Sequence, residues 1–391
     1  MLPPILARPG LQTSGFYFSY FAATGVHLPF WPLWLGDWGL SAAEVGFFTS
    51  VGVGVRVLAG LAIPALADRL DAWRATVVIC ALATAALFAA HLAITNVAVL
   101  FLATIATGVG FAAMGPIGEA LGIAAARLNA FPYAQARGLG SIGFLGANLV
   151  AGALMARFGS GVALWWIVAA LCVVAVLGAT HPGGGGVRDR APPRFREIGR
   201  LIGLPVFAIF MLAVAFVQAS HATYYALGSL HWRALGIGEA RIGALWGFSV
   251  AVEVVLMVAG GAFLMDRVGA IGCLLLSGLA GLVRWGVMTT DPTGLLLWPL
   301  QALHALSFGA GHLGAMAFIA RAVPPRYGAA AQGASGAMAA GLFMALGMAL
   351  SASVYPALGG GAYWIGAGLS SAGLACALWL ARRWRGEILP V

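Results

Sequence analysis

The chain alternates long apolar stretches with short segments rich in Gly, Pro, Arg or Asp. Most stretches reach the length of about 20 residues that an α-helix needs to cross the hydrocarbon core of a bilayer. The pattern therefore predicts twelve membrane helices joined by short loops. We place these helices at residues 13–35, 44–67, 75–94, 97–127, 135–156, 161–181, 204–230, 240–265, 270–289, 294–321, 332–356 and 361–381.

One segment of the first half recurs in the second half. Residues 39–56, GLSAAEVGFFTSVGVGVR, align with residues 236–253, GIGEARIGALWGFSVAVE, at a constant offset of 197 positions. Each copy continues through an apolar helix to an Asp-Arg pair. Such duplication is typical of transporters whose site lies between two repeats. We expect two six-helix halves, residues 1–181 and 204–391, joined by a linker at 182–203.

The composition excludes a water-soluble domain of this length. Hydrophobic residues make up 61% of the chain, charged residues only 8%, and the mean hydropathy is +0.95. These values indicate an all-α polytopic membrane protein that spans a lipid bilayer many times. All 21 basic residues are arginine and the formal net charge is +9, which alone is compatible with nucleic-acid binding.

The placement of the arginines argues against nucleic acid and predicts the orientation of the chain. Fifteen lie at the amino end, in the even-numbered loops, in the linker or in the tail, whereas Arg157, Arg233 and Arg241 lie in the opposite loops. Because positive residues stay cytoplasmic, both termini and the linker are expected inside. The start of the chain shows no cleavable signal peptide. We expect a monomer in a cell membrane such as a bacterial inner membrane.

The two Asp-Arg pairs follow the second predicted helix of each half. Asp68-Arg69 in residues 68–74 and Asp266-Arg267 in residues 266–269 resemble the cytoplasmic loop signature of the major facilitator superfamily, Gly-x-x-x-Asp-Arg-x-Gly-Arg-Arg. The match is partial, because Pro64 and Asp71 stand where glycines are usual. The resemblance implies a gate in which the carboxylate caps a neighbouring helix. The alternative is a pair of solvated turn charges.

Several charged residues fall inside predicted spans, where a charge costs roughly 2.5–3.5 kcal/mol or more unless it is paired or wetted. Arg56 lies near the middle of the second helix, and Glu253 takes its place in the second copy of the repeat. Glu119 and Arg137 lie on adjacent predicted helices and can pair at similar depth. Exposure in a loop is the alternative for Arg137. Arg284 lies within the ninth helix.

Polar and aromatic residues gather in the second half. Gln218, His221 and Tyr225 share one helical face, with Tyr224 at its edge. Such a face seldom meets lipid, because nothing there satisfies its hydrogen-bond donors. The eighth helix adds Trp246 two turns before Glu253.

The tenth helix carries His304 and His312, with Ser307 and Phe308 between them. Two membrane histidines can ligate haem or a metal, but no Cys, Asp or Glu cluster accompanies this pair, so we expect no metal and no cofactor. Packing is the alternative for each histidine. For His304, near an arginine and a glutamate on neighbouring helices, the sequence favours a functional role.

Five segments together resemble the phenylpropionate permease family of the major facilitator superfamily, and their order is kept. They are LPFWPLWL, QASHATYYALGSLHW, LWGFSVAVEVV, GLVRWGVM and ALHALSFGAGHLGAMAFIA. The family is similar in fold to the lactose permease type of sugar-proton symporter. This resemblance implies that Glu119 and Arg137 engage substrate, and that Glu253, Arg284 and His304 form a coupling network.

One departure from the lactose permease type changes the expected proton carrier. That type has a proton-carrying glutamate three residues after the histidine of the tenth helix, and here the residue is Ser307. Glu253, His304 and Glu119 therefore remain the candidates for proton coupling. Protonation of Glu253 would release a neighbouring arginine for the substrate.

We expect proton-coupled uptake of a small organic anion, such as an aromatic carboxylate, by alternating access. Arginine can offset the carboxylate, and aromatic side chains can form a flat wall for the ring. The arginines are Arg56, Arg137 and Arg284, and the wall residues are Tyr20, Phe21, Tyr224, Tyr225, Trp246 and Phe308. Gln218, His221 and His312 complete the candidate substrate site.

Three other functions are compatible with parts of the pattern. An exporter of drugs or metabolites shares the fold, and fold does not fix direction. A sugar or nucleoside symporter is compatible with the Glu-Arg pairs, but the chain lacks a dense amide lining. A membrane-embedded enzyme or sensor needs a nucleophile-base set, a metal cluster or a soluble output domain, and the sequence shows none of these.

Overall fold

The fold is all-α over the residues described by the computed structural model, 8–184 and 195–390. The first half contains α1 Arg8–Trp38, α2 Ala42–Arg69, α3 Trp73–Ala90, η2 His91–Ala93, α4 Val97–Asn129, α5 Tyr133–Phe158 and α6 Gly161–Ala179. The second half begins with α7 Phe195–Gly203, α8 Pro205–Ala219, α9 Ala222–Ala234, α10 Glu239–Val255, η3 Leu256–Gly260, α11 Gly261–Met288, η4 Gly294–Leu296 and α12 Leu297–Ala302. It ends with η5 Ala305–Ala310, α13 Gly311–Ala322, η6 Pro325–Tyr327, α14 Gly328–Gly336, η7 Ala337–Phe343, α15 Met344–Leu358, η8 Gly359–Ala362 and α16 Tyr363–Arg383.

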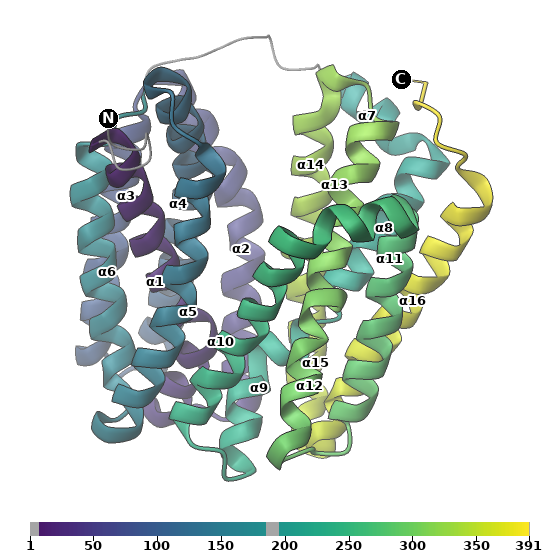
Figure 1. Ribbon diagram of the computed structural model, residues 1–391. Coiled ribbons are helices and arrows are strands. Elements are labelled where there is room, and N and C mark those ends of the chain that lie inside the picture. The colour runs from purple at the N-terminus through teal and green to yellow at the C-terminus, as the bar shows by residue number, and fades with distance from the viewer. Residues whose placement is uncertain (1–7, 185–194, 391) are drawn as a thin grey trace. The chain divides into compact units, whose positions relative to one another are not determined.

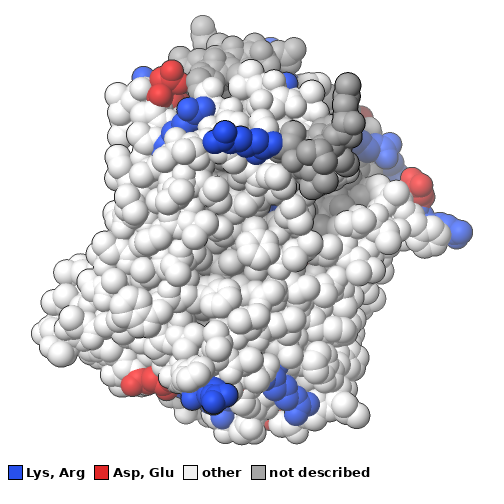
Figure 2. Space-filling model, turned by 60° about the vertical axis from the view of Figure 1, so that its left-hand side comes forward, with Lys and Arg blue, Asp and Glu red and all other residues white. Residues whose placement is uncertain are grey.

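Nine helical stretches of the described residues are long and apolar enough to cross a membrane. Two of them, Glu239–Met288 with 50 residues and Pro325–Arg383 with 59, are far longer than one crossing needs. Apolar side chains also cover much of the surface, and Leu58 of α2, for example, is 74% exposed. On the face shown in Figure 2, charged side chains gather at the two ends of the helices, with an uncharged zone between them.

The described chain forms two compact units. Within the described residues, the first comprises 8–41, 51–184 and 232–247, and the second comprises 42–50, 195–231 and 248–390. Two helices that begin in the repeated segment, α2 and α10, thus each pass from one unit to the other. The functional division at 1–181 and 204–391 stays a prediction.

In the first unit, α1 packs against α5 and α6, and α3 packs against α4 and α6 (Figure 1). Small residues permit this close packing. A Cβ at Gly25 would lie 2.8 Å from the backbone oxygen of Phe144, and one at Gly118 would lie 2.7 Å from the ring of Phe16. The side chain of Asn96 starts α4 by accepting hydrogen bonds from the next turn.

In the second unit, α11 packs against α13 and α16, and α8 packs against α16. The core there includes Phe210 and Phe318, whose rings stack with centroids 4.1 Å apart. Gly269 interrupts α11 with φ +66° and ψ −177°, a left-handed backbone that favours glycine. This break lies just after the second Asp-Arg pair.

Several predicted spans of the second unit are irregular at mid-length. The span that contains α8 and α9 is broken at Ser220 and His221, and π-helical turns occur at Leu256–Gly260, Ala305–Ala310 and Ala337–Phe343. π-Helical turns inside α-helices are frequently found at functional sites. In membrane proteins, interrupted helices also occur where the backbone lines a binding site.

Candidate functional site

In the first unit, Glu119 of α4 and Arg137 of α5 form the ion pair that the sequence predicts, with Arg137 Nε 2.6 Å from Glu119 Oε1. Both side chains are about one-third exposed. Tyr133 donates a short hydrogen bond to the same carboxylate. Tyr17 of α1 donates to Glu119 Oε2 at 3.4 Å and to the backbone oxygen of Gly118 at 3.1 Å. The carboxylate thus has one cationic and two phenolic partners.

Aromatic rings lie beside Arg137 and Arg56 in this unit. The guanidinium of Arg137 lies 4.1 Å from the ring centroid of Phe21, which in turn packs edge-on against Tyr20. Arg56 lies 5.6 Å above the ring of Phe111, and its buried Nε has no hydrogen-bond partner among the described residues. Arg56 therefore presents a cation that an aromatic face only partly compensates.

The second unit brings together Glu253, His304 and Arg284, which come from three different helical segments. His304 Nε2 lies 3.0 Å from Glu253 Oε2, and Arg284 Nη1 lies 3.0 Å from His304 Nδ1. Arg284 is completely buried. The three side chains form one continuous chain of polar contacts.

Neutral groups complete the surroundings of Arg284. Its Nη2 donates to Gln301 Oε1 at 2.8 Å, and its Nη1 also donates to Ser307 Oγ at 3.4 Å. Tyr224 donates to the same Gln301 oxygen at 3.1 Å. His221 Nε2 lies 3.2 Å from Ser307 Oγ. Arg284 therefore has hydrogen bonds but no direct carboxylate partner within the described ranges, 8–184 and 195–390.

The local irregularities of the helices position these groups. His221 lies in the break between α8 and α9, and Glu253 is three residues before the π-helical turn η3. His304 directly precedes a second such turn, η5, which contains Ser307. Gly309 gives the glutamate room, because a Cβ there would lie 3.2 Å from Glu253 Cγ.

The remaining predicted substrate residues differ in how close they lie to this cluster. Phe308 stacks on His304 at 5.2 Å, and Tyr225 packs on His221 at 5.6 Å between ring centroids. Gln218 contributes its backbone carbonyl, which accepts from His221 Nδ1 at 3.2 Å. His312 is exposed and interacts electrostatically with Glu253. Trp246 is buried in the first unit and thus lies in the other unit from Glu253.

The two predicted gating pairs are exposed and show different contacts: Asp68-Arg69 ends α2, and Asp266-Arg267 lies within α11 just before its break at Gly269. Asp68 Oδ1 accepts from Trp73 Nε1 at 2.5 Å, whereas the first turn of α3 has no side-chain cap. Arg69 and Asp266 are exposed, and Arg267 lies 5.1 Å from the ring of Phe263. Asp68 thus bonds to an indole and does not cap α3. The gating role stays a prediction.

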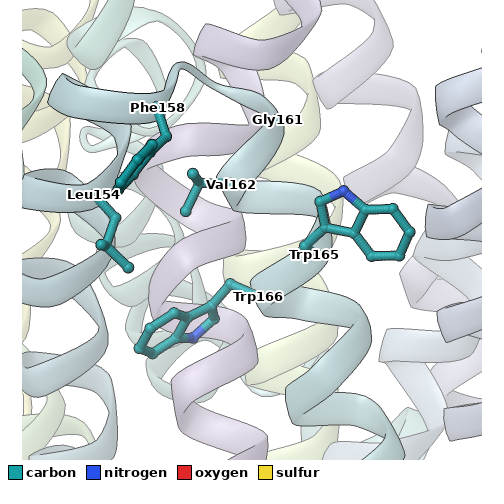
Figure 3. Close-up of a pocket in the computed structure, with 6 residues that line it drawn as sticks. All are labelled: Leu154, Phe158, Gly161, Val162, Trp165 and Trp166. Atoms are coloured by element: carbon teal, nitrogen blue, oxygen red, sulfur yellow. The ribbon is translucent and has the colours of Figure 1, made fainter.

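Two cavities lie apart from the predicted site residues. One, of about 480 Å³, is lined by apolar side chains where α5 ends and α6 begins, including Trp165 and Trp166 (Figure 3). The other, of about 490 Å³, lies at the Gly269 break beside Arg321 and Arg385. Neither cavity is lined by a residue of the candidate site.

Three participants were not predicted from the sequence: Gln301, Tyr17 and Tyr133. Their spacing to predicted residues is helical, but it does not single them out. Gln301 precedes His304 by three residues and Tyr133 precedes Arg137 by four, so each lies one helical turn from a predicted residue. Tyr17 precedes Tyr20 by three residues in the aromatic run of α1.

Long apolar helices with charged residues buried between them are typical of membrane transporters, and the comparisons show that the chain is of this class and not an enzyme. The sequence matches the family described as the MFS_1 like family over residues 11–365. The chain belongs to this family of the major facilitator superfamily.

Individual relatives are also transporters. The chain is 29% identical to the probable 3-phenylpropionic acid transporter of Escherichia coli over 356 residues, which cover 89% of this chain and 92% of the relative. The nucleoside transporter NupG superimposes with a TM-score of 0.76 at 17% identity, with 96% of this chain and 98% of that chain covered. A D-xylose-proton symporter gives 0.67 at 15% identity and 96% coverage of both chains. These two likenesses show the fold.

Proposed function

We propose that this chain is a secondary active transporter that takes up a small organic acid, such as an aromatic carboxylate, together with protons. The observation that carries the proposal is that the charge of Arg284 is buried and not compensated by a direct carboxylate partner among the described residues. This guanidinium is completely buried in a membrane helix and is bonded by neutral groups, with no direct carboxylate partner among the described residues. An uncompensated cation at such depth favours an anionic substrate.

Arg56, in the first unit, also favours an anionic substrate. Its aromatic neighbour compensates the guanidinium weakly, and its buried Nε has no described partner. Arg137 differs, because Glu119 already pairs with it. The relative named as a probable 3-phenylpropionic acid transporter is consistent with an aromatic carboxylate.

The rings beside these arginines suit an aromatic substrate. Tyr20 and Phe21 pack beside Arg137, and Tyr224 lies under Arg284, with the guanidinium carbon 5.0 Å from the ring centroid. Flat apolar faces next to a cation can hold a ring and its carboxylate at the same time. We assign the polar end of the substrate to the arginines and its ring to these side chains.

Proton coupling is assigned to Glu253 with His304. The carboxylate is bonded to the imidazole, and the imidazole is bonded to Arg284. A proton on Glu253 weakens the negative end of this chain and leaves the arginine freer to bind an anion. Glu119, the other candidate, differs in that it pairs directly with Arg137.

The proposed architecture has twelve membrane helices, cytoplasmic termini and two six-helix halves at 1–181 and 204–391. Each of the two very long stretches, Glu239–Met288 and Pro325–Arg383, supplies two crossings. With α1 added to the nine stretches, the number becomes twelve. We propose that this architecture works by alternating access, as a monomer in a bacterial inner membrane.

A substrate panel in proteoliposomes tests the proposal. An inward proton gradient should drive accumulation of 3-phenylpropionate inside the liposomes, but not of D-xylose or uridine. Glu253→Gln should reduce the gradient-driven accumulation at least about tenfold while exchange of internal for external substrate persists. Accumulation of xylose or uridine instead would show that the substrate is not an organic acid. Efflux driven by the proton gradient would show that the protein is an exporter. Unchanged uptake by Glu253→Gln would remove this residue from proton coupling.

A further inference from the structure

The hydrogen bonds around Arg284 determine which nitrogen of His304 carries the proton. Arginine can only donate, so His304 Nδ1, 3.0 Å from Arg284 Nη1, must accept. The hydrogen of the neutral ring is then on Nε2, which donates to Glu253 Oε2 at 3.0 Å. A second proton on Nδ1 would place an N–H group against the guanidinium. His304 therefore has no free position for a proton while Arg284 holds it.

The same reasoning gives the opposite result for His221. Its Nδ1 lies 3.2 Å from the carbonyl oxygen of Gln218, which can only accept, so Nδ1 carries the hydrogen. Its Nε2 then has a lone pair, which accepts from the hydroxyl of Ser307 at 3.2 Å. Ser307 Oγ in turn accepts from Arg284 Nη1 at 3.4 Å. Ser307 thus joins the imidazole of His221 to the guanidinium.

The cluster accordingly has an open proton position at each end. At one end, Glu253 is bonded to His304 through Oε2 and interacts electrostatically with His312, and protonation of its carboxylate adds the proton at Oε1. At the other end, His221 Nε2 can take a proton if the Ser307 hydroxyl turns its hydrogen toward the carbonyl of Leu303, one helical turn back. Ser307 Oγ would then accept from both the imidazolium and the guanidinium.

A cation on His221 would lie one hydroxyl group away from the guanidinium of Arg284, and two like charges repel each other. Arg284 and His304 both interact with it electrostatically. Its ring also contacts Tyr225 on its own segment, Trp285 on α11, and Phe308 on η5. Arg284 is the charged group among these. A substrate carboxylate at Arg284 would compensate the guanidinium, so anion binding and protonation of His221 would favour each other.

We propose that His221 is a second proton site of the transport cycle, joined to Arg284 through Ser307, so that one carboxylate anion is carried with two protons. The inference rests on the proposed function and assigns the other proton to Glu253. An N–H bond forms at His221 Nε2 on the loading side and breaks on the release side, while the O–H bond of Ser307 only rotates. Each cycle then moves one net positive charge.

The charge moved per substrate tests this inference independently of the transport rate. The purified protein is placed in liposomes with fixed gradients of pH and 3-phenylpropionate, and the membrane potential at which net flux stops is measured. The wild type should move one positive charge per anion. His221→Gln should move none, because a single proton balances the anion. Ser307→Ala should also move none, because a protonated His221 would lack a buried acceptor, whereas Ser307→Thr should keep the charge.

His231→Gln is the matched control. His231 is also a buried histidine, ten residues later, but it bonds to Asp291 and Tyr355 rather than to the arginine cluster. This variant should still move one charge per anion.

Electroneutral uptake by the wild type overturns the inference and leaves the proposed function standing, whichever variants fold. A retained charge in His221→Gln also overturns it. Absence of any acid uptake by the folded wild type overturns the proposed function and this inference with it.

Discussion

Three neutral side chains accept hydrogen bonds from the buried guanidinium of Arg284. Burial of a guanidinium without a carboxylate is unfavourable, and hydrogen bonds to Gln301, His304 and Ser307 offset part of that cost. Its Nε remains without a partner in the described chain. The protein therefore maintains a buried cation that it compensates incompletely, which is the property that the proposed anion site needs.

Substitution of Arg56 tests whether this residue recognises the charge of the substrate or only packs against it. Arg56→Gln should raise the KM for 3-phenylpropionate by about tenfold or more, because a charge-assisted hydrogen bond contributes about 1.5–3 kcal/mol. Arg56→Lys should have a smaller effect. Inhibition by the neutral amide of the same acid should be unchanged in both variants. An equal loss for acid and amide would show that Arg56 supports packing rather than the carboxylate.

His181 gives a prediction about pH and stability outside the membrane spans. It is completely buried after α6, its Nδ1 accepts from the backbone N–H of Gly183 at 3.1 Å, and its Nε2 has no described partner. Burial, aided by the nearby charge of Arg74, lowers the pKa of His181 from 6.5 to about 4. The folded state thus binds fewer protons than the unfolded state below pH 6.5.

The stability contributed by neutral His181 is fully present above pH 6.5 and is lost as the pH falls toward about 4. The total loss is roughly 3 kcal/mol. His181→Asn can keep the bond to Gly183, since an asparagine oxygen accepts from the N–H two residues on. The melting temperature of this variant should therefore fall less between pH 7 and pH 4 than that of the wild type. Parallel curves for the two proteins would refute the role of His181.

At this scale the sequence predicts the charged residues better than their neutral partners. Glu253, Arg284 and His304 stand out because a charge inside an apolar helix demands a reason. Gln301 does not, since an amide three residues before a histidine is equally compatible with many orientations. The Ser307 contact to His221 depends on a break in one helix and a π-helical turn in another, and neither can be read from periodicity.

At the scale of helices, the repeated segment shows why small residues recur at equivalent positions. Gly46 and Gly243 align in the two copies. A Cβ at Gly46 would lie 2.6 Å from Cβ of Ala352, and one at Gly243 would overlap the carbonyl oxygen of Asn148 on α5. Each glycine therefore lets the first turns of its helix, α2 or α10, pack directly on a neighbour in its own unit.

The packing of α10 on α5 yields a stability prediction. Gly243→Ala should lower the melting temperature by about 2 °C or more, because overpacking against a backbone atom typically costs about 1–3 kcal/mol. Gly146→Ala on α5 is the matched control, since a Cβ there meets nothing within 4 Å. That variant should be neutral or slightly more stable, because alanine favours helix. Equal melting temperatures for the two variants would contradict the packing argument.

Hydrophobic length predicts the existence of most helices, but it does not predict where they are interrupted. The span at 204–230 is apolar enough to read as one helix, yet it divides at Ser220 and His221. There the Ser220 hydroxyl donates to the Val217 carbonyl at 2.7 Å and accepts from Trp285 on another helix. These tertiary contacts favour the break, and they bring His221 beside Ser307.

At the scale of the whole molecule, the arginines bear on orientation as well as on binding. Those near helix ends outnumber the buried ones and concentrate on the linker, the even-numbered loops and the tail. An arginine in a short loop resists translocation, so its distribution orients the chain. The two Asp-Arg pairs, 68–69 at the end of α2 and 266–267 within α11, are predicted on the same side of the membrane.

Reporter fusions test this orientation and the number of helices together. Green fluorescent protein fused after the last residue should fluoresce, and alkaline phosphatase fused there should be inactive, because the carboxyl end is expected in the cytoplasm. Alkaline phosphatase fused after Gly159, between α5 and α6, should be active. Fusion after Ala130, between α4 and α5, should again be inactive. Phosphatase activity at both Gly159 and Ala130 would mean that α5 does not cross the membrane. Phosphatase activity at the carboxyl end, with a cytoplasmic amino end, would require an odd number of crossings. A reversed pattern at all three sites would instead show that arginine placement does not orient this chain.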